Sequence, residues 1–66
     1  MSRVVSDSEV WADLAARIAG STRAHDGVEP DVFEVDILTA QTAQHLGVDR
    51  DRVRDVYLAR LVMFGG

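Results

Sequence analysis

The chain has 66 residues and a formal net charge of −4, and all seven of its basic residues are arginine. A chain of this length forms one domain with a thin core, and 47% hydrophobic residues favour a folded domain over disorder. The absence of cysteine excludes disulfide bonds and cysteine-ligated metal. No apolar run reaches the ~20 residues of a membrane span, and no N-terminal signal is present. We therefore expect a single cytoplasmic domain over residues 1–66, with no membrane segment.

The first predicted element is an amphipathic helix over residues 7–19. Ser6 and Glu9 have the spacing of a capping box. Apolar residues then recur at the spacing of one helical face. The helix is predicted to end at Gly20, although it could continue to about Arg23.

Residues 20–30 predict a loop, because two glycines, a Ser-Thr pair and a proline interrupt the helical pattern. Residues 31–38 fit two patterns. Asp31 and Glu34 have the spacing of a second capping box, which favours a short helix. The alternation of apolar and acidic residues is typical of a strand. We prefer the short helix, because no other segment offers a partner strand, and this helix can continue into residues 40–46.

Residues 39–63 predict two helices joined by a tight turn. Gly47 tolerates the positive φ that ends the first helix. Ala43 is small enough for the two helices to approach closely. Val53 and Val56 lie three residues apart and anchor the second helix on one face.

Residues 39–57 resemble the helix-turn-helix DNA-binding domains. Residues 42–48, Thr-Ala-Gln-His-Leu-Gly-Val, resemble the corresponding run of the lambda Cro and repressor group. Residues 47–56, Gly-Val-Asp-Arg-Asp-Arg-Val-Arg-Asp-Val, resemble the recognition-helix segment in the fourth region of bacterial sigma factors. Thr39 is the expected N-cap of the first helix of this motif. The expected fold is therefore all-α, a small three- to four-helix bundle with a helix-turn-helix motif.

The positive charge of the chain is concentrated in residues 39–66, as expected if the second helix of the motif faces DNA. Residues 1–38 carry three arginines and eight acidic residues, a net charge of −5, whereas residues 39–66 carry four arginines and three aspartates, a net charge of +1. The N-terminal turns of the second helix of such a motif enter the major groove, where arginine bonds guanine and an acid accepts from cytosine. The residues that the resemblance and this charge pattern place at or near DNA are Gln41, Thr42, Arg50, Asp51, Arg52, Arg54 and Asp55.

Two aspartates on this face allow another interpretation. Asp51 and Asp55 oppose phosphate binding, and they have the i,i+3 spacing to pair with Arg54 and Arg52. Such pairing would leave a nearly neutral, solvated helix face.

The end of the same helix is apolar on several sides. A homodimer, or a complex with another protein, would cover these side chains. The alternative is that the first helix covers them within one chain. The predicted interface residues are Tyr57, Leu58, Leu61, Val62 and Phe64.

The sequence shows no nucleophile–base pair, phosphate-binding loop or metal-ligand spacing, so we expect no enzyme, cofactor or metal. The leading hypothesis is a small DNA-binding transcriptional regulator that binds double-stranded DNA as a homodimer. Exclusive use of arginine suggests a GC-rich bacterial or phage genome. The alternative is a protein-binding adaptor, or a phage-encoded modulator of a host protein, on a helix-turn-helix-like fold. The acidic N-terminal half motivates this alternative.

Overall fold

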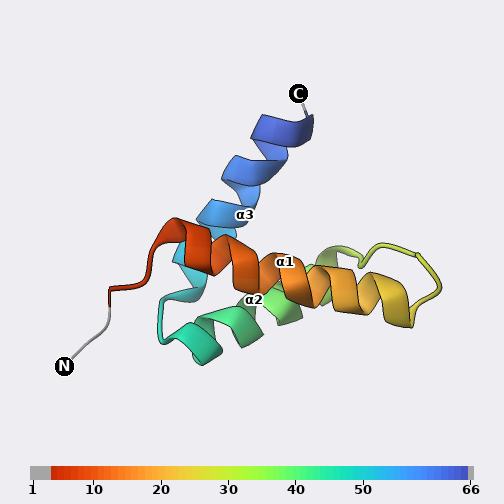
Figure 1. The fold of residues 1–66 in the computed structure, drawn as a ribbon, viewed down its shortest axis with the longest axis horizontal. Coiled ribbons are helices and arrows are strands. Elements are labelled where there is room, and N and C mark those ends of the chain that lie inside the picture. The colour runs from red at the N-terminus through yellow and green to blue at the C-terminus, as the bar shows by residue number, and fades with distance from the viewer. Residues whose placement is uncertain (1–3, 66) are drawn as a thin grey trace.

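The computed structural model of the protein describes the backbone of residues 4–65 and the side chains of residues 4–63. It contains three helices, α1 (Asp7–Ala24), α2 (Val32–Leu46) and α3 (Arg50–Gly65), and no strand in the part of the chain described. Each helix packs against the other two, and the end of α3 projects away from α1 and α2 (Figure 1). None of these helices combines the length and apolar character needed to cross a membrane. The expected all-α fold is confirmed.

Side-chain caps start the first two helices. The Ser6 hydroxyl accepts a hydrogen bond from the Glu9 amide (3.2 Å), and the Asp31 carboxylate accepts one from the Glu34 amide (2.9 Å). Each bond satisfies an amide that has no partner within its own helix. Both caps were predicted, and the second shows that the helical interpretation of residues 31–38 is correct.

The first helix is longer than predicted. It continues past Gly20, which is exposed, and ends at Ala24. The chain then turns through Asp26 and Gly27, whose φ angles are 57° and 87°. The Gly27 amide donates to the Thr22 carbonyl (2.8 Å). The loop therefore begins later than predicted, because a single exposed glycine weakens a helix without ending it.

The second helix is continuous from Val32 to Leu46, which confirms the alternative in which the short helix continues into residues 40–46. Thr39, the predicted N-cap of a new helix, lies inside α2 and is buried. Its hydroxyl donates to the Asp36 carbonyl one turn earlier (2.7 Å). The N-cap prediction is wrong, because no glycine or proline interrupts the segment and Asp31 already starts the helix.

A tight turn joins α2 to α3. Gly47 adopts the left-handed conformation, with φ 70° and ψ 33°. The Val48 amide donates back to the Ala43 carbonyl (3.0 Å). The Asp49 carbonyl accepts the Val53 amide (3.3 Å) as α3 begins. The predicted role of Gly47 at the turn is confirmed.

The core is small and lies near one end of α3. Among the side chains of α3 that the structure describes, two belong to the core, and both lie in the first half of the helix. Beyond them, the guanidinium of Arg60 lies 5.5 Å from the centre of the Trp11 ring on α1. The buried apolar residues in the described part of the chain are Val5, Val10, Leu14, Leu38, Ala43, Val53 and Val56.

Gly20 and Gly47 give opposite predictions for substitution by alanine. Gly47→Ala lowers the free energy of unfolding by about 1 kcal/mol, because alanine is strained at positive φ even though its Cβ would meet no atom within 4 Å. Gly20→Ala raises it by about 0.5–1 kcal/mol, because this site is helical, exposed and open. Urea unfolding followed by circular dichroism measures both values. A loss of stability in Gly20→Ala would contradict the helical path of α1 through this residue.

Candidate interaction surfaces

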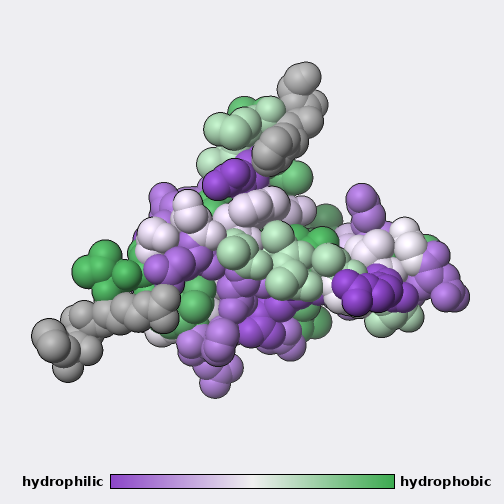
Figure 2. Space-filling model, viewed as in Figure 1, coloured by the Kyte–Doolittle hydropathy of each residue, from purple (hydrophilic) through white to green (hydrophobic). Residues whose placement is uncertain are grey.

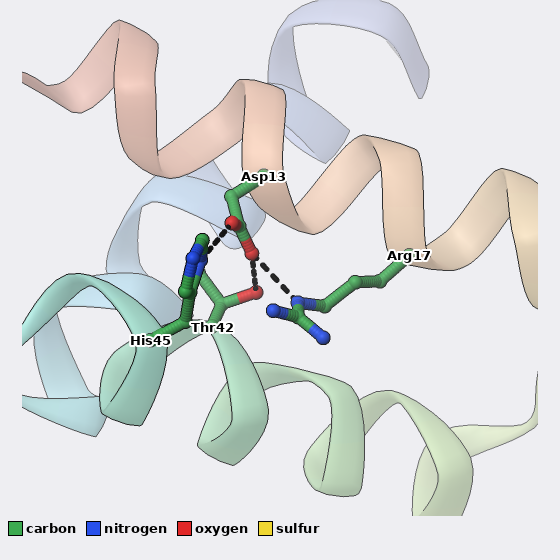
Figure 3. A network of polar contacts seen from close by, with 4 residues as sticks. All are labelled: Asp13, Arg17, Thr42 and His45. Carbon is green, nitrogen blue, oxygen red and sulfur yellow. Dashed lines mark hydrogen bonds and ion pairs between the residues drawn. The ribbon is translucent and has the colours of Figure 1, made fainter.

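A polar cluster joins α1 to α2 (Figure 3). Asp13 of α1 reaches across to α2, where the Thr42 hydroxyl donates to its Oδ1 (2.9 Å) and the His45 Nδ1 lies 2.6 Å from its Oδ2. Arg17, one turn along α1, donates from Nε to the same Oδ1 (2.7 Å). The Asp13–Arg17 ion pair therefore lies between two helices and not on the outer face of α1.

The environment of Asp13 keeps its carboxylate ionised. Burial alone raises the pKa of Asp13, but hydrogen bonds from Arg17, His45 and Thr42 together outweigh burial, and the pKa is lowered from its ordinary value. The carboxylate is therefore a fixed negative charge that positions α2 against α1.

The same cluster removes one predicted DNA contact from the surface. Thr42 has no exposed area, and its hydroxyl already donates to Asp13. A phosphate group cannot reach this side chain in the folded protein. Gln41, its neighbour on α2, is exposed.

The start of α3 presents four of the predicted DNA-contact residues to solvent. Arg50, Asp51, Arg54 and Asp55 are all exposed, and within residues 4–63 none has an ion-pair partner. The predicted i,i+3 pairs of these aspartates with arginines of α3 are therefore not formed. Because Asp49 is exposed beside them, two arginines and three aspartates give this surface a net charge of −1.

Arg52 points away from that surface, toward the beginning of α1. Its Nη2 donates to the Asp7 carboxylate (3.0 Å), and the same nitrogen donates to the Val5 carbonyl. This arginine ties α3 to the N-terminal end of α1. These contacts separate Arg52 from the other predicted DNA-contact residues of α3, which are exposed at the start of that helix.

A groove runs between the first half of α2 and the middle of α3. Its volume is about 280 Å³. Valines of α2 and the side chains of Tyr57, Leu58 and Leu61 make its walls apolar, and two aspartates and one arginine add charge. The residues that line it are Pro30, Asp31, Val32, Val35, Asp36, Thr39, Arg54, Tyr57, Leu58 and Leu61.

Three of the predicted interface residues of α3, Tyr57, Leu58 and Leu61, line this groove. Leu58 and Leu61 are 46% and 47% exposed, Val62 is more exposed, and Tyr57 is half-buried. Hydrophobic residues are visible on the projecting end of α3 in Figure 2. The alternative, in which α1 covers this end, is wrong for these side chains. Phe64 lies outside the residues whose side chains the structure describes.

Apolar residues of α2 were missed by the sequence reasoning. Val32 and Phe33 are 78% and 81% exposed, and Ile37 is also exposed. The available signal was the density of apolar residues in 32–38, which exceeds what one buried helix face needs. We use the term apolar α2/α3 surface for Val32, Phe33, Ile37, Leu58, Leu61, Val62 and Met63.

An acidic region borders the groove. Asp31 lines the groove and also a second hollow at the turn between α1 and α2. That hollow contains Asp26, Glu29 and Glu34 as well. Glu34 accepts a hydrogen bond from the Ser21 hydroxyl of α1 (2.8 Å). Five of the eight acidic residues in residues 1–38 thus lie in the groove or in the neighbouring hollow.

No protein-family model, curated protein or solved structure matches this chain. Functional inference therefore depends on the surfaces described above.

The Asp13 cluster generates a pH-dependent prediction. Asp13→Ala lowers the free energy of unfolding by about 1–3 kcal/mol near neutral pH, because the buried Thr42 hydroxyl loses its acceptor. Since folding lowers the pKa of Asp13, this stabilisation is present above the ordinary aspartate pKa of about 3.9. It is lost as the pH falls through the lowered value.

Urea unfolding near pH 7 and near pH 3 tests this expectation, and the gap between parent and variant shrinks at the lower pH. Asp55→Ala is the matched control, because Asp55 is an exposed helical aspartate without an ion-pair partner in residues 4–63. Equal losses in the two variants would contradict the role of the cluster.

Proposed function

We propose that this chain is a protein-binding module whose recognition surface is the groove between α2 and α3. The observation that carries the proposal is the exposure of apolar side chains on both helices that form the groove. Three members of the apolar α2/α3 surface, Val32, Leu58 and Leu61, line the groove itself. The other members lie on the same two helices.

The apolar lining of the groove supports a protein partner. Val32, Leu58 and Leu61 line it and are 46–78% exposed. Surfaces of this kind on small soluble domains mark sites of interaction with another molecule. Covering one leucine contributes about 1.5–3 kcal/mol, so a few such contacts are enough for specific binding.

A helix-turn-helix-like arrangement of α2 and α3 is the proposed scaffold. The positive φ of Gly47, the buried Ala43 and the two buried valines of α3 support it. These positions are the ones on which the sequence resemblance depends. In the proposed function, this scaffold holds the two walls of the groove at a fixed separation.

Charge favours a protein over DNA as the main partner. Phosphate contacts supply most of the affinity of a DNA-binding protein. The start of α3 has a net charge of −1, and Arg52 is paired with Asp7. Asp31 and Asp36 lie in the groove beside Arg54. A phosphate backbone along α3 would therefore meet several carboxylates.

Selection from a displayed library of random peptides tests the proposal. We expect enrichment of peptides that lose affinity for Leu58→Asp by about ten- to a hundredfold, the equivalent of one buried leucine. Leu58 is half exposed, so this variant should fold. Val28→Asp is the control, because Val28 is exposed but outside the groove. If no peptide prefers the parent to Leu58→Asp, the groove is not a recognition surface.

A DNA-binding regulator is the second candidate. The observation that favours it is the pair of exposed arginines, Arg50 and Arg54, on the first turns of α3. In this candidate they contact base edges or phosphates in the major groove.

The second candidate predicts that Arg50→Ala and Arg54→Ala each weaken binding to duplex DNA by about 1–3 kcal/mol. Arg23→Ala is the matched control, because Arg23 is an exposed arginine on another helix. Binding to a mixed pool of duplexes, measured at low and near-physiological salt, compares the four proteins. If the parent retains no duplex at low salt, this candidate is excluded.

A further inference from the structure

We propose that the groove binds a helical segment of another protein, with one apolar face and with Lys or Arg on the edge that meets α2. This inference rests on the proposed protein-binding function and specifies the chemistry of the partner. It follows from the shape of the groove and from the charges in its walls.

The shape of the groove suits a helix. Two helices form its walls, and Val32, Leu58 and Leu61 supply apolar contacts on both sides. An amphipathic helix fills such a space with residues spaced three and four apart. A peptide bound as an added β-strand would instead need a sheet edge for its backbone hydrogen bonds, and the described residues contain no strand.

The charges of the two walls differ in sign. Asp31 and Asp36 lie in the α2 wall, and among residues 4–63 neither has a cationic partner. The neighbouring hollow adds Asp26 and Glu29 to the same side. The α3 wall carries Arg54. A bound helix is therefore oriented by basic side chains toward α2 and by an acidic or neutral side chain toward Arg54.

A second copy of this chain fits these charges poorly. Each copy has a net charge of −4. The apolar segment that a second copy offers is the end of α3, residues 58–63, where Arg60 is the single charged residue. Arg60 already lies over Trp11 of its own chain. Residues 58–63 of a second copy therefore offer no free cation to Asp31 and Asp36.

The test uses a displayed library of helical peptides of about 16 residues, or four turns. Leucines are fixed at positions three and four apart, and the remaining positions encode Lys, Glu or Ala. We expect Lys on one edge of the enriched peptides. These peptides should bind at least tenfold more tightly than their Lys→Glu counterparts at low salt, and the difference should shrink as salt screens the charges.

Two double variants test whether the preference for Lys depends on the carboxylates of the groove. Asp31→Asn with Asp36→Asn removes the groove carboxylates, and asparagine keeps the capping ability needed at the start of α2. Asp51→Asn with Asp55→Asn makes the same change in net charge on the start of α3, outside the groove lining. We expect the preference for Lys to fall at least fivefold in the groove variant and to remain in the control.

The outcomes separate this inference from the proposed function. Enriched peptides that require Leu58 but show no preference for Lys would overturn the basic partner and leave the protein-binding function standing. An equal loss of preference in the two double variants would also overturn the inference, because net charge alone would explain it. If no peptide binds, and the protein self-associates in a way that Leu58→Asp abolishes, then a second copy of the chain occupies the groove. That result would also overturn the inference. No enrichment and no self-association would overturn both proposals.

Discussion

The small size of the core is the constraint on which the rest of the structure depends. In the described residues, α3 adds only Val53 and Val56 to it, both from the first half of the helix. Polar contacts complete the assembly where apolar contacts are few. Asp13 holds α2 against α1, and Asp7 holds Arg52 of α3. The second half of α3 lies beyond both, and this is why its apolar side chains stay exposed.

Local signals in the sequence predicted the parts of the fold that depend on neighbouring residues. The caps at Ser6 and Asp31 and the turn at Gly47 follow from short-range hydrogen bonds and backbone preference. The misplaced boundaries have the same origin. Gly20 and Thr39 both resemble helix ends, but packing against neighbouring helices outweighs the weak local preference of one residue.

The site was harder to predict, because it depends on contacts between residues far apart in the sequence. Helical periodicity correctly placed Leu58 and Val62 on an exposed face. It could not show that Arg52 pairs with Asp7, or that Thr42 donates to Asp13, since these contacts span 45 and 29 residues. The α2 wall of the groove was missed for a related reason. Once residues 32–46 form one helix, its first turns extend alongside α3 and expose Val32 and Phe33.

The stacking of Arg60 on Trp11 links the projecting half of α3 to α1. Trp11 is the single tryptophan of the chain, and it is half-buried at this junction. Its indole ring therefore senses both solvent and a cation carried by α3. The protein thus contains an intrinsic fluorophore at the base of the projecting half of α3, and the emission of that fluorophore depends on where α3 lies.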